Sequence, residues 1–270
     1  MARVSLVVSS YNQPNALALV LEGVLTQTHA IDELLVGDDG SQDDTRELVA
    51  TFAQRAPFPV RFESQPDHGF RKSRALNNAI RAATGERFLF LDGDCIPPPR
   101  WAGFHLAALE AGADFSTAGY VLLDLEQTRS LTPEEIAAGR IDARCDAEQR
   151  RRFRGIHRRE RLYRWLRRPR KPKIRGGNWA VTRAALFAVN GFDERFDGFG
   201  KEDSDVRNRL CNSGFTGVSL WDRAWVFHCS HELDERRNRP EVVRSQPDRS
   251  YYASRLSATT CEHGLVQSSR

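Results

Sequence analysis

The sequence lacks a long apolar run. No stretch approaches the roughly 18 consecutive apolar residues that a membrane-spanning helix needs. The first apolar stretch, residues 4–8, is too short for the core of a signal peptide. We therefore expect a cytoplasmic protein.

Cysteine is scarce and scattered. The 270 residues include five cysteines, an odd number, and no two of them are spaced as CxxC. This pattern argues against a disulfide framework and against a cysteine-rich zinc module. We expect the thiols to be reduced.

The glycine motifs of phosphate-binding loops are also missing. Neither GxGxxG nor GxxxxGK[ST] occurs, so neither a dinucleotide-binding loop nor a P-loop is supported. With 19 Gly and 12 Pro in 270 residues, collagen-like and low-complexity classes are excluded as well. Because 40% of the residues are hydrophobic, the chain can bury a sizeable core, as one large domain or as two fused halves.

The first hundred residues alternate between strand and helix patterns. Short apolar runs predict strands at residues 4–8, 34–36, 60–63 and 87–91. Helical spacing of apolar residues predicts helices between them, at residues 17–28, 44–52 and 76–83. We expect the second helix to begin with a capping box formed by Ser41 and Asp44. Strands separated by helices form a parallel sheet, and ligands bind beyond the carboxyl ends of its strands.

Asp92 and Asp94 follow the fourth expected strand on one turn. Two carboxylates at i and i+2 can converge on one divalent cation, while water and phosphate oxygens fill its other positions. The pattern therefore indicates a diphosphate site. The alternative is that both aspartates cap the following turn.

Asp38 and Asp39 end the second expected strand, so they would face the same crevice. Carboxylates there can accept hydrogen bonds from a base or from ribose hydroxyls. The alternative is that the Asp-Gly pair at residues 39–40 forms only a turn.

Residues 191–205 combine several carboxylates with glycines and aromatic residues. Such a segment could supply a general base and polar contacts to a hydroxyl-rich ligand. The alternative is a loop followed by a helix with an acidic first turn. Farther along, His228 and His231 lie close in sequence, and one of them could join Asp94 to complete a cation site.

Basic residues are concentrated between residues 150 and 173, where thirteen occur in 24 positions, interleaved with Phe153, Tyr163, Trp165 and Leu166. Self-repulsion at this density disfavours a compact element but suits a polyanionic partner. We expect a mobile or surface-binding segment that contacts anionic lipid or an anionic glycan. A module that binds single-stranded nucleic acid is the alternative, but it leaves the acidic constellations unexplained.

Taken together, the motifs resemble a known family. They are VSLVVSSYN at residues 4–12, DDGS at 38–41, GFRKSRALN at 69–77, DGDCIP at 92–97, GGN at 176–178, GFDE at 191–194 and GKED at 200–203. In this order they are similar to the inverting family 2 glycosyltransferases of the GT-A fold. The second half is similar to the galactosyltransferase-type acceptor module of chondroitin-polymerase-like and bacterial polysaccharide enzymes. The resemblance covers about residues 3–231.

The resemblance implies an α/β protein of the GT-A fold, in which a Rossmann-like nucleotide-binding sheet has helices on both faces and is merged with a smaller acceptor-binding half. Residues 1–100 would bind the nucleotide sugar. Residues 101–232 would bind the acceptor and hold the catalytic groups, with the basic segment inside them at 150–175. Residues 233–270 would form a C-terminal tail.

The resemblance also implies a reaction. A hexose would move from a nucleotide sugar, with UDP as the expected nucleotide, to a hydroxyl of a glycan or glycolipid in bacterial polysaccharide or lipopolysaccharide synthesis. Transfer would be inverting and would depend on Mn²⁺ or Mg²⁺. A metal-dependent nucleotidyltransferase is the alternative, although the GKED motif would have no role there. We expect no nucleic acid partner, and we expect a cytoplasmic protein that contacts the inner face of the plasma membrane through its basic segment.

Carried over residue by residue, the resemblance assigns the nucleotide to Tyr11, Asp38, Asp39, Arg71 and Asp92. These residues belong to the motifs of the first hundred residues.

The same comparison assigns the cation to Asp94 and His228, with Asp92 in its shell, and leaves His231 as the alternative to His228.

For the transfer itself, the resemblance makes Asp203 the catalytic base, while Glu202 holds the acceptor. Asn178 and Phe199 would contact the donor or acceptor sugar, and Phe199 stands where many relatives have tryptophan.

Overall fold

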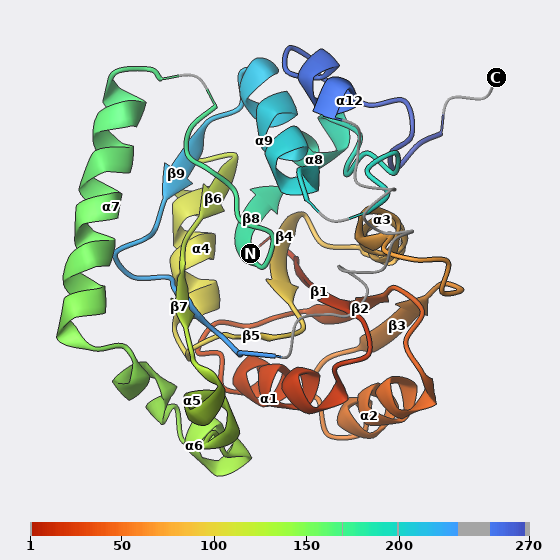
Figure 1. Cartoon of the computed structure of the whole chain (residues 1–270), viewed down its shortest axis with the longest axis vertical. Helices are drawn as coiled ribbons and strands as arrows, with labels where there is room; N and C mark the ends of the chain where they lie inside the picture. Colours follow the sequence, from red (N-terminus) through yellow and green to blue (C-terminus); the bar gives the residue numbers. More distant parts are fainter. Residues whose placement is uncertain (1, 169, 199, 232–248, 268–270) are drawn as a thin grey trace.

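The computed structural model describes residues 2–168, 170–198, 200–231 and 249–267 (Figure 1). Its centre is a seven-stranded sheet in the order β3-β2-β1-β4-β8-β6-β9. The strands are β1 (Val4–Ser10), β2 (Glu33–Asp38), β3 (Val60–Ser64), β4 (Arg87–Asp92), β6 (Phe115–Thr117), β8 (Asn178–Thr182) and β9 (Gly217–Ser219). The first four run parallel, whereas β8 is antiparallel to both β4 and β6. Strands from beyond residue 100 therefore extend the sheet that the first hundred residues begin.

The strands and helices expected in the first hundred residues are confirmed. The helices are α1 (Pro14–Leu25), α2 (Asp43–Ala53) and α3 (Lys72–Ala82). The expected capping box is wrong, because Gln42 precedes α2 and its side chain caps nothing. Ser41 instead donates its hydroxyl to Asp38 and accepts the backbone N–H of Asn12 at 2.8 Å.

Helices cover both faces of the sheet, as expected for the GT-A fold (Figure 1). One core contains α1, α2 and α4 (Trp101–Glu110) against one face. The other core contains α3, α8 (Arg183–Ala188) and α9 (Glu202–Asn212) against the opposite face. Strands β1, β2 and β4 contribute residues to both cores, which explains their near-continuous apolar sequences.

A three-stranded sheet lies beyond the end of β4. It joins β5 (Cys95–Ile96), β10 (Val226–His228) and β7 (Tyr120–Leu122), in the order β5-β10-β7. Strand β10 runs antiparallel to β5, and His228 pairs with Cys95. This register brings a histidine from the second half of the chain next to Asp94.

Short helices connect β7 to the rest of the chain: α5 (Leu125–Arg129), α6 (Pro133–Ala137) and the 3-10 helix η1 (Arg140–Arg144). At the start of α6 the Thr132 hydroxyl accepts the backbone N–H of Glu135 at 3.2 Å. All five cysteines are unpaired, as expected.

The basic segment forms a regular element. Helix α7 (Ala147–Trp165) runs along one edge of the molecule (Figure 1). Its start is fixed by a capping box between Asp146 and Gln149, and Phe153 anchors it in the core. We expected a mobile or surface-binding segment. Its part up to Trp165 is a helix, in keeping with the good helix propensity of arginine, whereas residues 166–168 and 170–175 form no helix or strand. Over the part of the chain that the structure describes, no helix is long and apolar enough to cross a membrane.

The end of the described chain packs against the second core. Helix α12 (Arg249–Ser254) is followed by a segment in which Cys261 and Leu265 are buried. The Arg81 guanidinium donates to the carbonyl oxygens of Gly264 and Leu265, at 2.6 and 3.0 Å. Residues 233–248 and 268–270 of the expected tail lie outside the described residues.

Candidate active site

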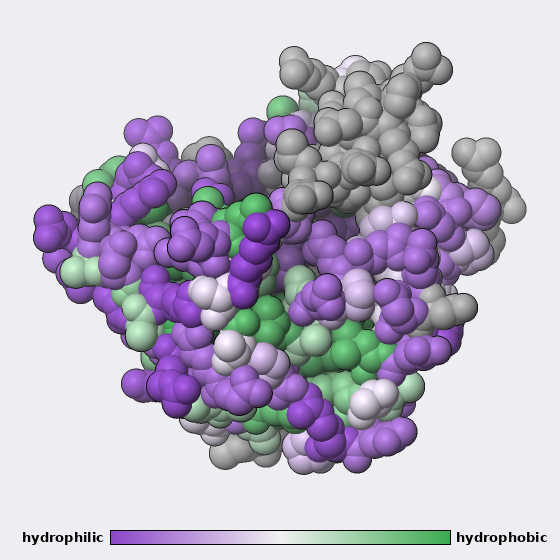
Figure 2. Space-filling view, turned by 60° about the horizontal axis from the view of Figure 1, so that its bottom comes forward, coloured by the Kyte–Doolittle hydropathy of each residue, from purple (hydrophilic) through white to green (hydrophobic). Residues whose placement is uncertain are grey.

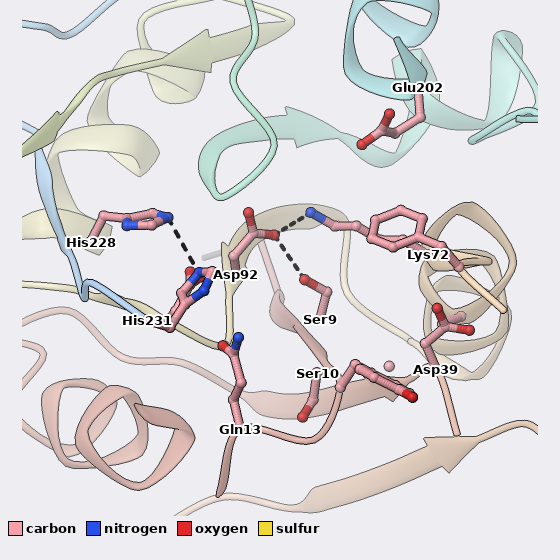
Figure 3. Close-up of a pocket in the computed structure, with 15 residues that line it drawn as sticks. Ser9, Ser10, Gln13, Asp39, Lys72, Asp92, Glu202, His228 and His231 are labelled. Atoms are coloured by element: carbon pink, nitrogen blue, oxygen red, sulfur yellow. Dashed lines mark hydrogen bonds and ion pairs between the residues drawn. The ribbon is translucent and has the colours of Figure 1, made fainter. Parts of the chain in front are cut away.

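A cleft opens at the carboxyl ends of β1, β2 and β4 (Figure 3). Its lining comes from both halves of the chain: Ser9, Ser10, Tyr11, Gln13, Gly37, Asp39, Phe70, Lys72, Ala75, Asp92, Gly93, Asp94, Glu202, His228 and His231. The space inside, open to solvent, is about 780 Å³.

Asp92 occupies the middle of the cleft. Its Oδ1 accepts the Ser9 hydroxyl at 2.8 Å and forms an ion pair with Lys72 Nζ (Figure 3). Burial disfavours the charged ammonium, but the carboxylates of Asp92, Asp203 and Glu202 hold the pKa of Lys72 above its usual value. Lys72 therefore stays protonated and offsets the negative charge around Asp92.

Asp94 faces two histidines. Its Oδ2 lies 3.1 Å from Nε2 of His231 and 3.5 Å from Nε2 of His228. Burial acts against the ionised carboxylate, yet the His231 hydrogen bond and the His228 charge lower the pKa of Asp94 to about 2. One ligand atom from each of these three residues lies within 4.8 Å of the others. A carboxylate and two imidazoles that converge in this way fit a divalent cation, with Asp92 beside them.

A second group of possible ligand atoms comes from Asp92, Asp94 and Cys95. Burial, followed by the charges of both aspartates, raises the pKa of the Cys95 thiol well above its usual value. Sulfur also suits hard cations such as Mg²⁺ and Mn²⁺ less well than oxygen ligands do. The histidine-containing group is therefore the better cation site of the two.

Glu202 and Asp203 stand in the first turn of α9. The chain enters this turn through Gly200 and Lys201, whose φ angles of 101° and 78° are both in the left-handed region. Glu202 lines the cleft. Asp203 lies against Gly176, so close that a Cβ atom on this glycine would be 2.7 Å from Asp203 Oδ2. One carboxylate oxygen of each acid, Glu202 Oε2 and Asp203 Oδ1, is buried with no hydrogen-bond partner among the described residues.

Both acids have raised pKa values. Burial raises the pKa of Glu202. Burial, followed by repulsion from Glu202, raises the pKa of Asp203 to about 8, although the charge of Lys72 opposes this shift. A carboxyl group with such a pKa can accept a proton near neutral pH.

A polar corner closes the other end of the cleft. Asp39 accepts Gln65 Nε2 at 2.7 Å and the backbone N–H of Arg71 at 2.8 Å. The Tyr11 hydroxyl donates to Asp67 at 2.8 Å. Tyr11 and Asp39 both line the cleft, whereas the Arg71 guanidinium donates to the carbonyl oxygen of Pro66.

Four of the expected site residues that the structure describes do not line the cleft: Asp38, Arg71, Asn178 and Asp203. Asp38 is fully buried, and its carboxylate holds the turn by accepting the backbone N–H of Ser41 at 2.9 Å and the Ser64 hydroxyl at 2.7 Å. Asp39 reaches the cleft instead, because successive side chains of an extended chain point to opposite sides.

Asn178 is another of these residues, and it lies fully buried in the core. Its Oδ1 accepts Trp101 Nε1 at 2.8 Å and contacts His105 Nε2 at 3.0 Å. Its Nδ2 donates to the carbonyl oxygens of Gly119 and Ala224 at 2.7 and 2.9 Å. The amide is thus fully occupied by the fold. Phe199, the other expected sugar contact, lies outside the described residues.

Sequence reasoning missed Lys72, Ser9 and Gln13 as residues of the cleft. Lys72 lies within the motif at residues 69–77, so its signal was present, but a lysine at the start of a helix resembles an ordinary solvent-exposed residue. Ser9 and Gln13 flank the end of β1, where the parallel-sheet rule places ligands.

Two family descriptions match the chain. Residues 5–187 match "Glycosyl transferase family 2", and residues 157–232 match "N-terminal domain of galactosyltransferase".

Curated relatives extend this similarity. The chain is 26% identical over 237 residues to a chondroitin synthase of Escherichia coli, covering 83% of this chain and 34% of that protein. It is also 26% identical over 262 residues to a validoxylamine A glucosyltransferase of Streptomyces hygroscopicus, covering 87% of this chain and 57% of that protein. The chain thus spans about a third of the length of the chondroitin synthase and somewhat over half of the length of the glucosyltransferase.

Solved structures show the same fold. A mannosyltransferase of Pyrobaculum calidifontis, solved in complex with GDP-Man and Mn²⁺, matches with a TM-score of 0.60 and 19% identity, over 86% of this chain and 58% of that one. The family match spans more than half of this chain, and the fold matches that of the GT-A neighbours. The chain belongs to glycosyl transferase family 2.

Proposed function

We propose that this protein transfers a sugar from a nucleotide sugar to a hydroxyl group of a glycan or glycolipid, with inversion at the anomeric carbon. The observation that carries the proposal is the cluster of Asp92, Asp94, His228 and His231 in one cleft with the polar corner at Asp39. A cation-binding cluster and a hydrogen-bonding corner in one cleft suit the two ends of a nucleoside diphosphate.

In this proposal Tyr11 and Asp39 hold the nucleoside, since both line the cleft and Asp39 lies at its end away from the histidines (Figure 3). Asp92 contacts the ribose and the cation shell. Asp94 holds a divalent cation together with His231 and His228, whose Nε2 atoms both lie within 3.5 Å of its Oδ2. When bound there, Mn²⁺ or Mg²⁺ would act as a Lewis acid that offsets the charge of the departing diphosphate.

Asp203 serves as the general base. An acceptor hydroxyl is a weak nucleophile at neutral pH, so its proton must pass to a carboxylate as its oxygen attacks the anomeric carbon. The new C–O bond forms as the bond to the diphosphate oxygen breaks, and this single displacement inverts the centre. Glu202, which lines the cleft, orients the acceptor. The buried, unpartnered Oδ1 and the raised pKa of Asp203 support its role.

The relatives support the finer parts of the proposal. A chondroitin synthase and a glucosyltransferase among them favour a hexose donor and a role in bacterial polysaccharide synthesis. UDP is the nucleotide that we propose for the donor. We further propose that the enzyme works in the cytoplasm at the inner face of the plasma membrane.

The cation assignment is tested by calorimetry with UDP. We expect binding heat with Mn²⁺ or Mg²⁺ and little heat in EDTA, because Asp92 and Asp94 would otherwise repel the diphosphate. His231→Ala and His228→Ala should each weaken binding in Mn²⁺, and His29→Ala, on the turn after α1, is the control. Equal affinity with and without cation contradicts the cation site.

The reaction itself is tested with a panel of nucleotide sugars. Cation-dependent release of the nucleoside diphosphate, with transfer to an added glycan, supports the proposal. Release of pyrophosphate from a nucleoside triphosphate would point instead to nucleotidyl transfer.

A further inference from the structure

The outer face of α7 is unusual for a surface helix. Trp165 is 77% exposed, Leu162 is 49% exposed and Leu166 is 47% exposed. These three large apolar side chains fall within five consecutive residues at the end of the helix. The side of the molecule where α7 lies is otherwise mostly hydrophilic (Figure 2).

The inner face of α7 fixes which side chains point outward. The Phe153 ring lies 5.5 Å from the ring of Trp221 and 5.8 Å from that of Trp225. One and two turns farther along, His157 contacts Asp222 at 3.2 Å and the buried Glu160 contacts Lys171 at 3.3 Å. Since these contacts hold the helix, the apolar residues at its end are not needed to attach it to the core.

Arginines surround the apolar residues. Helix α7 carries eight arginines and two glutamates, and one of these glutamates, Glu160, is buried. Arg158 and Arg161 line a shallow depression together with Leu162 and Trp165. Among the described parts of the chain, no ion pair involves Arg158 or Arg161. Their charge is therefore available to a partner.

We propose that the C-terminal end of α7 docks on an anionic lipid bilayer. Leu162, Trp165 and Leu166 enter the interface between head groups and acyl chains, and the neighbouring arginines contact lipid phosphates. Apolar aromatic and aliphatic side chains next to arginines are the pattern of helices that lie in a membrane interface. Each arginine near an anionic surface strengthens binding by about fivefold.

A bilayer fits this surface better than a nucleic acid. Single-stranded nucleic acid binds through bases stacked on successive aromatic rings. Trp165 is the one strongly exposed tryptophan, since the other four are at most 9% exposed, and two leucines beside it offer no stacking surface. Acyl chains, in contrast, favour leucine and tryptophan alike.

A short stretch of chain connects the docking end of α7 to the cleft. Only the ten residues 167–176 separate Leu166 from Gly177, which lies against Asp92. This inference rests on the proposed function and deepens it, because an acceptor presented at a bilayer is a lipid-linked glycan.

Trp165 provides a direct probe. The other four tryptophans are buried, so a change in fluorescence on vesicle binding reports mainly on Trp165. We expect a blue shift with vesicles of phosphatidylglycerol and phosphatidylcholine, and quenching when their acyl chains are brominated. Pure phosphatidylcholine vesicles, or high salt, should give a much weaker response. No nucleotide, cation or acceptor is needed, so this measurement is independent of catalysis.

Matched variants locate the surface. Leu162→Gln combined with Leu166→Gln should raise the vesicle dissociation constant about tenfold or more, since two apolar side chains leave the interface. Val266→Gln, a position 69% exposed elsewhere on the surface, is the control. Arg158→Glu combined with Arg161→Glu should have a similar effect. Arg46→Glu combined with Arg55→Glu, in and just after α2, is its control.

The outcomes separate this inference from the proposed function. Absence of quenching by brominated lipid, equal binding to neutral vesicles, or unchanged binding by both α7 variants overturns the docking surface. A Trp165 response to single-stranded RNA but not to vesicles also overturns it. Loss of vesicle binding with normal cation-dependent donor hydrolysis would confirm that α7 acts outside the catalytic cleft. Vesicle binding by a protein that hydrolyses no nucleotide sugar would contradict the proposed function alone.

Discussion

Gly177 lies so close to Asp92 that a Cβ atom on the glycine would be 2.7 Å from Asp92 Oδ2. The preceding residue, Gly176, has the same relationship to Asp203 Oδ2, also at 2.7 Å. Two adjacent glycines therefore lie against the two carboxylates on which the proposed reaction depends. Any side chain at either position would move a carboxylate.

Gly177→Ala is expected to lower transfer about 100-fold, because an added methyl group must displace Asp92, and misplacement by about 1 Å can cost that much. Steady-state kinetics and thermal unfolding would be measured together. Gly155→Ala is the matched control, since a Cβ there meets nothing within 4 Å, and within α7 it should stabilise the protein by about 1 kcal/mol. Full activity in Gly177→Ala would show that the position of Asp92 is not critical.

Asn178→Ala is expected to reduce stability rather than sugar recognition. It would leave the ring nitrogens of Trp101 and His105 and the Ala224 carbonyl group without this buried partner, while the Gly119 carbonyl group keeps the Val226 N–H at 3.2 Å. Each such group costs about 1–3 kcal/mol, so the free energy of unfolding should fall by about 3 kcal/mol or more. Urea denaturation measures this loss. Asn212→Ala, which removes two exposed hydrogen bonds at the end of α9, should cost less. Normal stability with weakened donor binding would return Asn178 to the site.

Much of the fold could be predicted, because buried parallel strands and amphipathic helices have distinct sequence periods. Helix α7 could not be predicted in the same way. Phe153 is the one large apolar residue of this helix that is buried. The other buried position is occupied by a charged residue, Glu160. A pattern with so few inward apolar residues does not reveal a helical period.

The site was predictable where the chemistry depends on local spacing. Asp92 and Asp94 follow a strand directly, so their place in the cleft follows from the sheet. The roles of Asp38 and Asn178 depend on distant partners such as Ser64 and Trp101, which no local pattern reveals. The choice between His228 and His231 also required the fold, and both lie near Asp94.

Lys72→Met is expected to shift the pH dependence of transfer upward. The Lys72 charge opposes the raised pKa of Asp203, so its loss should raise that pKa further and leave less of the base ionised at neutral pH. Initial rates at saturating donor, measured from about pH 6 to 9, would show the rising limb move to higher pH. Lys72→Arg, which keeps the charge, should shift the limb less. Identical pH profiles for Lys72→Met and the parent would exclude electrostatic coupling between Lys72 and the base.

Asp203→Asn is expected to leave donor binding nearly intact and to lower transfer by about 10²- to 10⁴-fold, the range for loss of a general base. The amide keeps the shape of the carboxylate and loses its basicity. In the parent protein, transfer should rise with pH towards the pKa of about 8, because only the ionised carboxylate accepts a proton. Glu202→Gln is the comparison, and a larger loss there with an active Asp203→Asn variant would reassign the base to Glu202.

The same substitution should change how stability depends on pH. The pKa of the Asp203 carboxyl is raised from 3.8 to about 8 on folding, so the unfolded chain loses this proton at lower pH. Raising the pH from about 4 to about 8 therefore favours unfolding in the parent, because the carboxyl ionises in the unfolded chain over this range but stays protonated in the folded protein, where burial and Glu202 disfavour its charge. Asp203→Asn removes this contribution, so its free energy of unfolding should fall less over that range. Chemical denaturation at several pH values tests this, and parallel curves for parent and variant would show that Asp203 ionises normally in the folded protein.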